Sequence, residues 1–295
     1  MGLFKKKELK QQLDQKAKFQ SMFMMQLLFE KAPIKPKIET IKEALKKKFG
    51  EVDIVSADKA LTSFAIKKYT ATFKEGRLPP QVLIMDVQAF NGDEISQLER
   101  SQLWNVENGN SVLEECKYVI TISDMMASVM DYKERCELLM DWLEATLEMF
   151  PECKAVWIKT AGNLFMTEQI LEHNIPREER FIYFCVNVRF FNIQGTNDML
   201  VDTLGLYAIG LPDVQYHFHD IEPNDVVNHA SNVASYLFDN NVPIENGQTI
   251  DGIVNGQLSR EIQWKCHYEM SLIQPEREVV DICPGQHASG GREYR

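Results

Sequence analysis

The sequence predicts an α+β fold with mixed or mostly antiparallel sheets and flanking helices. Strand-like runs and helical repeats alternate irregularly along the 295 residues, without the strict strand–helix–strand order of a doubly wound parallel sheet. Strand pairs joined by short turns occur near both ends of the chain. Both halves contain a strand, a helix and further strands, so the chain could consist of two related α+β modules packed together, although no sequence repeat shows a duplication.

The chain divides into four predicted segments. Residues 1–20 form a basic, helix-prone extension, and residues 21–175 form an N-terminal α+β module. Residues 176–285 form a C-terminal α+β module that begins in a polar, proline-containing stretch. Residues 286–295 are rich in glycine and polar side chains, which predicts a flexible tail.

Hydrophobic periodicity predicts the elements of the N-terminal module. Strands are expected at 22–30, 53–56, 61–73, 80–87, 117–123 and 153–159. Helices are expected at 38–49, 93–102, 132–150 and 167–173. The helix at 132–150 has the clearest pattern, because Cys136, Leu139, Leu143 and Leu147 form one apolar stripe and Pro151 ends it.

The same reasoning predicts the elements of the C-terminal module. Strands are expected at 181–193, 214–219, 260–269 and 278–283, a helix is expected at 223–238, and 199–209 could be a strand or a short helix. In the strand at 214–219, alternation places Val214, Tyr216 and Phe218 toward the interior. His217 and His219 then point the other way.

The net charge of −11 is unevenly distributed. Residues 1–50 hold 13 lysines and 5 acidic residues, which gives +8, so the rest of the chain carries −19. An acidic body argues against a nucleic-acid partner, because neutralisation of phosphate charge supplies much of that affinity. The basic N-terminus could make a weak electrostatic contact with an acidic partner or an anionic membrane surface, or simply form a solvated tail and helix face.

The apolar runs and the cysteines of the sequence indicate the cellular compartment. No apolar run is long enough to cross a bilayer, and the first residues lack the apolar core of a signal peptide. The six cysteines are scattered, with no C-x-x-C pair, as expected of buried thiols in a reducing compartment. We therefore expect a cytoplasmic protein.

Nine short strings of the sequence are specific enough to compare with known families: 81–86, 121–127, 132–135, 187–195, 202–206, 210–213, 215–219, 238–240 and 247–250. They resemble a family of bacterial proteins known as domain of unknown function 4261. The resemblance extends over roughly residues 22–285. The resemblance implies a bacterial, cytoplasmic setting, and the family provides no catalytic residues to carry over.

The first candidate site is a group of metal-capable side chains. His217 and His219 form an H-x-H pair on one face of a predicted strand, where two imidazoles can hold one metal ion. A third ligand could come from Asp220, Glu222 or His229, with His267 as a further donor. An open site of this kind could activate water for hydrolysis. The alternative is that both imidazoles lie on the wetter face of an ordinary strand.

The second candidate site consists of polar residues at strand ends and on polar strand faces. Asp86 and Asp124 each end an apolar run, and Asn187 and Arg189 interrupt another. If neighbouring strands bring Arg189 near Asp86 or Asp124, the result is either a buried ion pair or a cleft for a small ligand. The alternative is that the aspartates cap helices and Arg189 is structural.

No motif of catalysis with a fixed spacing occurs in the chain. It lacks the G-x-S-x-G nucleophile elbow and the glycine patterns of the Walker and Rossmann loops. We expect a non-catalytic protein-binding module of the immunity or accessory type, with no cofactor unless the histidines bind a divalent metal. The alternatives are a metal-dependent hydrolase that uses His217 and His219 and a small-ligand-binding protein.

Overall fold

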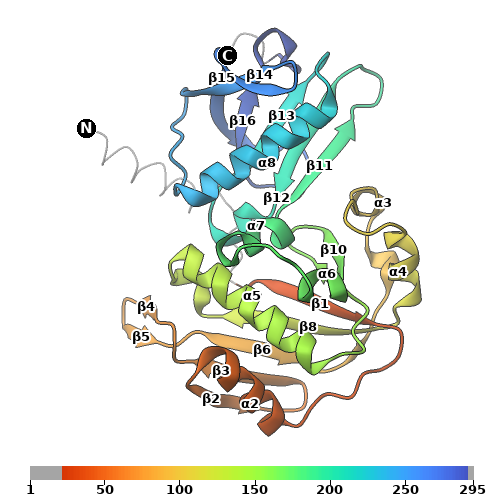
Figure 1. Ribbon diagram of the computed structural model, residues 1–295, viewed down its shortest axis with the longest axis vertical. Helices are drawn as coiled ribbons and strands as arrows, with labels where there is room; N and C mark the ends of the chain where they lie inside the picture. Colours follow the sequence, from red (N-terminus) through yellow and green to blue (C-terminus); the bar gives the residue numbers. More distant parts are fainter. Residues whose placement is uncertain (1–21, 292–295) are drawn as a thin grey trace. The chain divides into compact units, whose positions relative to one another are not determined.

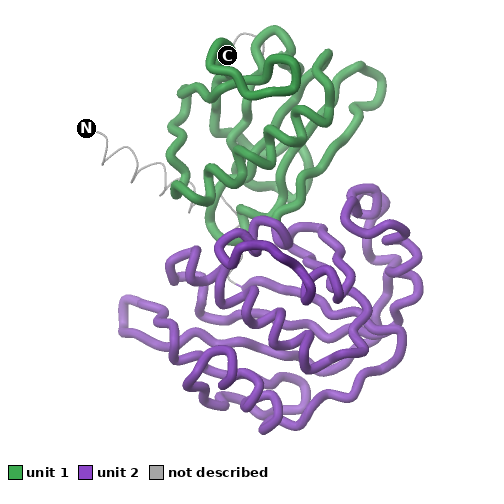
Figure 2. Tube along the Cα trace, in the orientation of Figure 1, with its two compact units in different colours: residues 1–19, 186–295 green, residues 20–185 purple. Residues whose placement is uncertain are grey.

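The computed structural model describes residues 22–291, which divide into two compact units (Figure 2). One unit ends at Cys185 and the other begins at Val186. The predicted boundary between residues 175 and 176 lies before this point, because the segment up to Cys185 packs with the first unit. The predicted extension at 1–20 and the last four residues of the predicted tail lie outside the described residues.

The first unit contains an eight-stranded sheet (Figure 1). Its strands are β1 (Met24–Phe29), β2 (Val52–Ala57), β3 (Leu61–Ile66), β6 (Gln81–Met85), β7 (Gln88–Ala89), β8 (Tyr118–Met125), β9 (Ala155–Ile158) and β10 (Asn163–Met166). Seven of them follow the order β10-β9-β1-β8-β6-β3-β2, and β7 pairs with β8. All these pairs are antiparallel. A separate hairpin is formed by β4 (Ala71–Phe73) and β5 (Gly76–Leu78).

Helices complete the core of the first unit. They are α2 (Ile38–Phe49), α3 (Gln97–Arg100), α4 (Gly109–Glu115), α5 (Tyr132–Met149), α6 (Thr167–Leu171) and α7 (Arg180–Cys185). α5 begins after Asp131, whose carboxylate accepts hydrogen bonds from the Lys133 and Glu134 amides, and it packs against α2 and β8. A second cluster packs α4 against Leu28 of β1 and Trp157 of β9. The helices therefore pack on the sheet through buried apolar side chains.

The second unit is built on a six-stranded sheet (Figure 1). Its strands are β11 (Asn187–Asn192), β12 (Met199–Leu204), β13 (Asp213–Phe218), β14 (Thr249–Val254), β15 (Gln257–Met270) and β16 (Glu278–Cys283), in the order β11-β12-β13-β16-β15-β14. β13 and β16 are parallel, and the other pairs are antiparallel. One long helix, α8 (Pro223–Asp239), packs across β11, β12 and β13. The α+β class is confirmed.

The two faces of the second sheet differ in composition. Val214, Tyr216 and Phe218 of β13 are fully buried on the face that α8 covers, as the alternation predicted. Gln215, on the opposite face, is also fully buried, so that face is polar without being wet. Of the predicted site residues, His229 lies on the face covered by α8, and Arg189 lies on the opposite polar face.

Several local predictions are wrong. The strand predicted at 181–193 begins only at Asn187, because Phe181, Phe184 and Cys185 are buried at helical spacing in α7. The strand predicted at 61–73 is interrupted by a turn in which the Tyr69 amide donates to the Ile66 carbonyl. α4, β10 and β14 were not predicted from the sequence.

The structure also bears on the predicted flexible tail and on the predicted relation between the two modules. Residues 286–289, expected at the start of a flexible tail, pack against β13, where Phe218 and Ala288 form a β-bridge and Ser289 donates its amide to the His217 carbonyl. The two sheets differ in strand order, and only the second has a parallel pair, so their topology does not support a duplicated module. In residues 22–291, no helix is both long and apolar enough to span a membrane.

Candidate functional site

The predicted histidine pair lies where β13 ends. The His217 Nε2 atom is 3.5 Å from the Asp198 carboxylate, and the His219 Nδ1 atom is 3.0 Å from the Ser289 hydroxyl. The Asp220 carboxylate lies 3.9 Å from the His219 ring, on a side chain that is 78% exposed. The strand therefore places both imidazoles on one face, next to hydroxyl and carboxylate groups.

His229 does not join this pair, although the sequence offered it as a third ligand. Its Nδ1 atom is 2.6 Å from the Tyr216 hydroxyl, and its Nε2 atom is 2.8 Å from the Asp251 carbonyl. Because a carbonyl only accepts, Nε2 carries the proton and Nδ1 accepts from the Tyr216 hydroxyl. Tyr216 and His217 point to opposite faces of β13, so His229 lies across the sheet from the proposed metal pair. Burial lowers the pKa of His229, and the hydrogen bond to Asp251 opposes this shift.

The other metal donors also lie apart from a common centre. Within residues 22–291, no group of three histidine, cysteine, aspartate or glutamate side chains has a geometry that could hold a metal ion. Glu222 is the residue before α8, and its carboxylate accepts from the Asn224 amide at 3.4 Å. His267 lies opposite Asp281 in the β15–β16 pair. The sequence thus located the pair correctly on one strand face but not a complete ligand set.

The second predicted site separates into two unrelated ion pairs. Asp124 of β8 is buried and bonds Arg135 of α5, with 2.6 Å between Oδ2 and Nε, and it also accepts the Phe23 amide. Asp86 follows β6, and its amide donates to the Ala60 carbonyl. Neither aspartate is the partner of Arg189, so the predicted pairing of Arg189 with Asp86 or Asp124 is wrong. Strand neighbours decide such pairings, and the sequence alone does not specify which strands are adjacent.

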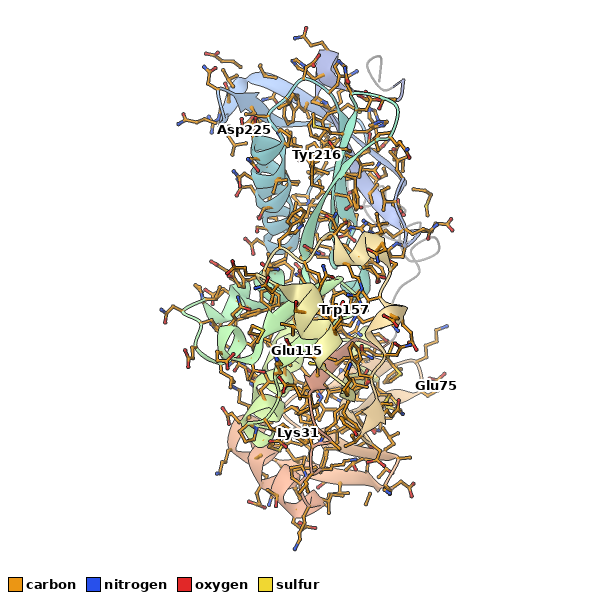
Figure 3. All side chains as sticks on the ribbon, turned by 90° about the vertical axis from the view of Figure 1, so that its right-hand side faces the viewer. Lys31, Glu75, Glu115, Trp157, Tyr216 and Asp225 are labelled. Carbon is orange, nitrogen blue, oxygen red and sulfur yellow. The ribbon has the colours of Figure 1, made fainter. Side chains whose placement is uncertain are left out.

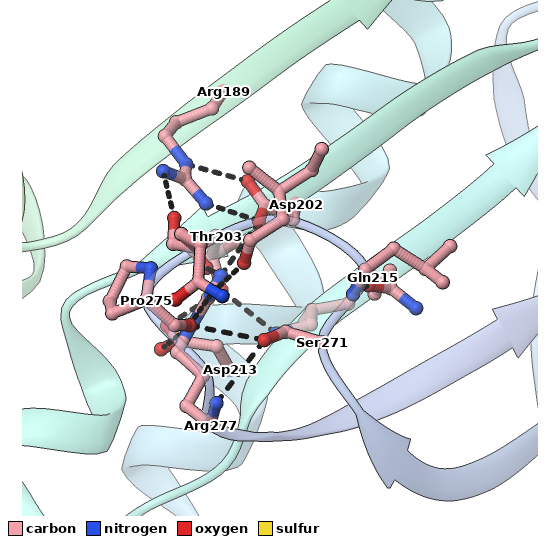
Figure 4. Close-up of polar contacts among 12 residues, drawn as sticks. Arg189, Asp202, Thr203, Asp213, Gln215, Ser271, Pro275 and Arg277 are labelled. Atoms are coloured by element: carbon pink, nitrogen blue, oxygen red, sulfur yellow. Dashed lines mark hydrogen bonds and ion pairs between the residues drawn. The ribbon is translucent and has the colours of Figure 1, made fainter. Parts of the chain in front are cut away.

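Arg189 instead joins a buried charge cluster in the second unit (Figure 4). Its guanidinium forms a two-point contact with Asp202, at 2.8 Å from Nε to Oδ1 and 2.5 Å from Nη2 to Oδ2. Asp202 lies directly opposite Arg189 in the β11–β12 register. Asn187, two residues before Arg189, is buried on the same face, opposite Leu204. Asn187 and Arg189 therefore both lie buried on one face of β11.

Arg277 completes the charge cluster, and the sequence reading did not identify it. It is fully buried, and its guanidinium contacts Asp202 at 2.7 Å and Asp213 at 3.0 Å. Burial disfavours its charged form, but the two carboxylates outweigh this, so the pKa of Arg277 is raised. Burial raises the pKa of Asp213, and Arg277 and the Thr203 hydroxyl oppose that shift. A lone arginine before a strand gives no sequence signal of this role.

The cluster continues as a polar row across five strands. The register places Arg189, Asp202, Gln215, Asp281 and His267 opposite one another on β11, β12, β13, β16 and β15. The Gln215 side chain donates to Asp281 at 2.9 Å and accepts the Leu272 amide at 2.8 Å. The segment between β15 and β16 thereby closes over the row. Arg189, Asp202, Gln215 and Asp281 of the row have hydrogen-bond partners within the protein, whereas the Nε2 atom of His267 is buried without one among the described residues.

The second unit also contains a pocket of about 620 Å³. It lies between the start of α8, the β14–β15 hairpin and the segment after β16; Figure 3 labels Asp225 at this end of α8. Three carboxylates line it, from Asp220, Glu222 and Asp225. Its apolar lining is Ile221, Ile253, Ile262, Trp264 and Pro284, and its remaining lining is Asn255, Gly256, Gln263, Gly285, Gln286 and His287. No lysine or arginine is part of the lining.

One family model matches a segment of the second unit. The model described as domain of unknown function (DUF4261) matches residues 202–283. Residues 202–283 are thus similar to the DUF4261 family. The resemblance drawn from the sequence over 22–285 is thus confirmed for this part of the chain. Comparisons with curated proteins and with solved structures each gave no significant match.

The DUF4261 segment contains most of the charge cluster and most of the pocket lining. Asp202, Asp213 and Arg277 of the charge cluster lie within it, and Arg189 lies just before it. The pocket lining from Asp220 to Trp264 is also within it, and only the residues from Pro284 to His287 follow it. The segment therefore includes both the structural cluster and the pocket.

Proposed function

We propose that this chain is a non-catalytic protein-binding module and that the β14–β15 hairpin and the adjoining acidic pocket form its binding face. The pocket is the observation that carries the proposal, because it combines carboxylates with apolar side chains in one concave surface. Leu258 and Ile262 of the same hairpin are 57% and 41% exposed. Exposed apolar side chains beside a pocket are typical of a protein-binding surface. From the resemblance, the proposed setting is the bacterial cytoplasm.

The two alternative functions receive less support from the geometry. A hydrolase built on His217 and His219 needs a third ligand, and His229 is engaged with Tyr216 and Asp251 on the other sheet face. A small-ligand site built on Asp124 and Arg189 needs them in one cleft, and each is held in its own buried ion pair. His229, Asp124 and Arg189 are thus each engaged in contacts within their own unit.

The proposal predicts one stoichiometric partner that binds through the hairpin face. The tagged chain, expressed in its source organism, should capture that partner, and Ile262→Asp should abolish the capture because a carboxylate then replaces an apolar contact. Leu78→Asp is the matched control, since Leu78 is 51% exposed on the hairpin of the other unit. Capture that persists in Ile262→Asp, or that is lost equally in Leu78→Asp, would contradict the proposal, as would the absence of any stoichiometric partner.

A further inference from the structure

We infer that the acidic pocket recognises a lysine or arginine side chain in an apolar segment of the partner protein. This inference rests on the proposed protein-binding function and specifies the chemistry of the partner. It depends on three features of the pocket: its charge, its apolar walls and the way in which the hairpin keeps it open.

The charge of the pocket is negative and largely uncompensated. Among the described residues, Glu222 and Asp225 have no ion-pair partner, and Asp220 has only the His219 ring at 3.9 Å. The N-terminus of α8 contributes about half a positive charge, which favours carboxylates there but offsets only a small part of three negative charges. A cationic group is therefore the complementary ligand.

The apolar walls indicate a cation on a hydrocarbon stem rather than a bare ion. Trp264 is 3% exposed, so its ring is a fixed part of the lining, and Ile253 and Ile262 lie on the same hairpin. Lysine and arginine bury three or four methylene groups along apolar surface while the charged group stays at a polar site. An indole also attracts a cation placed over its face. Both parts of such a side chain thus find a matching surface.

The tip of the hairpin keeps the carboxylate of Asp225 accessible. Asn255 and Gly256 connect β14 and β15 with φ values of 50° and 75°, as in a two-residue type I′ turn. A Cβ atom on Gly256 would lie 3.2 Å from one carboxylate oxygen of Asp225 and 3.4 Å from the other. Glycine therefore brings the backbone close to Asp225 without a side chain that would cover it.

The test uses the full chain and three capped pentapeptides. One has a lysine between apolar residues, and the others have norleucine or glutamate in its place. Calorimetric titration should show binding of the lysine peptide at least about tenfold tighter than the norleucine peptide, since it adds several charge contacts. Raising the salt from about 50 to about 500 mM should weaken the lysine peptide selectively, because salt screens exposed charges.

Matched variants assign the effect to the pocket. Glu222→Gln with Asp225→Asn should weaken the lysine peptide to the level of the norleucine peptide, while Glu261→Gln, on an exposed residue of β15 outside the pocket, should leave it unchanged. Thermal unfolding checks that each variant is folded. Equal binding of all three peptides, or no binding, would overturn the inference, as would calcium binding that needs the two carboxylates when no peptide binds.

The two failures can be distinguished. If Ile262→Asp abolishes partner capture but the Glu222→Gln, Asp225→Asn variant captures the partner fully, the binding face stands and the cationic contact is wrong. If Ile262→Asp has no effect on capture, the proposed function itself fails, whatever the peptides show.

Discussion

At the scale of single residues, His229 shows how a polar side chain can serve the interior. It lies on the buried face of α8, yet both ring nitrogens have partners, Tyr216 on the central β13 and Asp251 on the edge strand β14. The contact with Asp251 also occupies a backbone carbonyl on an edge strand, where unpaired groups invite association with other chains. One side chain thus links a helix, a central strand and an edge strand.

The buried ring makes the stability of the second unit depend on pH. Because the pKa of His229 is lowered in the folded protein, the unfolded chain binds a proton first as the pH falls. The contribution of His229 to the free energy of unfolding should therefore be complete above about pH 6.5, the ordinary pKa of histidine. Below that pH the free energy of unfolding should decline by at most about 1.4 kcal/mol per pH unit.

The variant His229→Gln provides the comparison for this pH effect. It should cost roughly 1–2 kcal/mol at pH 7.5, through weakened hydrogen bonds, and should remove the His229 part of the decline. Denaturant unfolding at pH 7.5, 6.5 and 5.5 measures both quantities. Identical slopes in the two proteins would show that His229 does not titrate as described.

At the scale of elements, the β14–β15 hairpin depends on close packing at one glycine. The register between the two strands shifts between Asp251 and Gly252, and a Cβ atom on Gly252 would lie 2.8 Å from the indole of Trp264 and 2.9 Å from Ile262. The backbone torsion is not the reason, since Gly252 is not among the residues with positive φ. The absence of a side chain lets the indole pack on the strand and form the pocket wall.

Gly252→Ala should therefore destabilise the hairpin by steric conflict. Overpacking against a buried indole should cost about 1–3 kcal/mol in the free energy of unfolding. In a Trp264→Leu background the same change should cost clearly less, because the conflicting ring is absent, and the double-mutant cycle measures that coupling. An equal cost in both backgrounds would assign the effect to the backbone instead.

At the scale of the whole molecule, each compact unit has its own buried ion pairs. Asp124 and Arg135 join the sheet to α5 in the first unit, and Asp202 joins Arg189 and Arg277 in the second. The two groups share no residue, and each lies within a separate core. Loss of one group should accordingly loosen only its own unit.

Hydrogen exchange with mass spectrometry tests this independence. Asp202→Asn leaves buried guanidinium charge without its partner, which should cost roughly 3 kcal/mol. That loss corresponds to an increase of about 100-fold in the exchange rate of those amides that exchange only when residues 186–291 open. Asp124→Asn should raise exchange in residues 22–185 instead. Acceleration spread over both units by either variant would show that they open together.

The sequence determined the parts that depend on local periodicity. The stripe of α5, the repeat of α8 and the alternation of Val214, Tyr216 and Phe218 each identify a buried face from neighbours along the chain. The same local patterns placed His217 and His219 together on one strand face. They failed at 181–185, where aromatic residues favour a strand by composition but are buried at helical spacing.

Only the tertiary structure decided which polar groups meet. Arg189 could be assigned to Asp202, and Arg277 recognised at all, only once β11, β12 and the segment before β16 were adjacent. The pocket likewise joins residues near 220, 260 and 285, whose chemistry is unremarkable along the chain. The physical reason is that side-chain periodicity is set by neighbouring residues, whereas strand order and charge pairing are set by long-range contacts that carry no local signal.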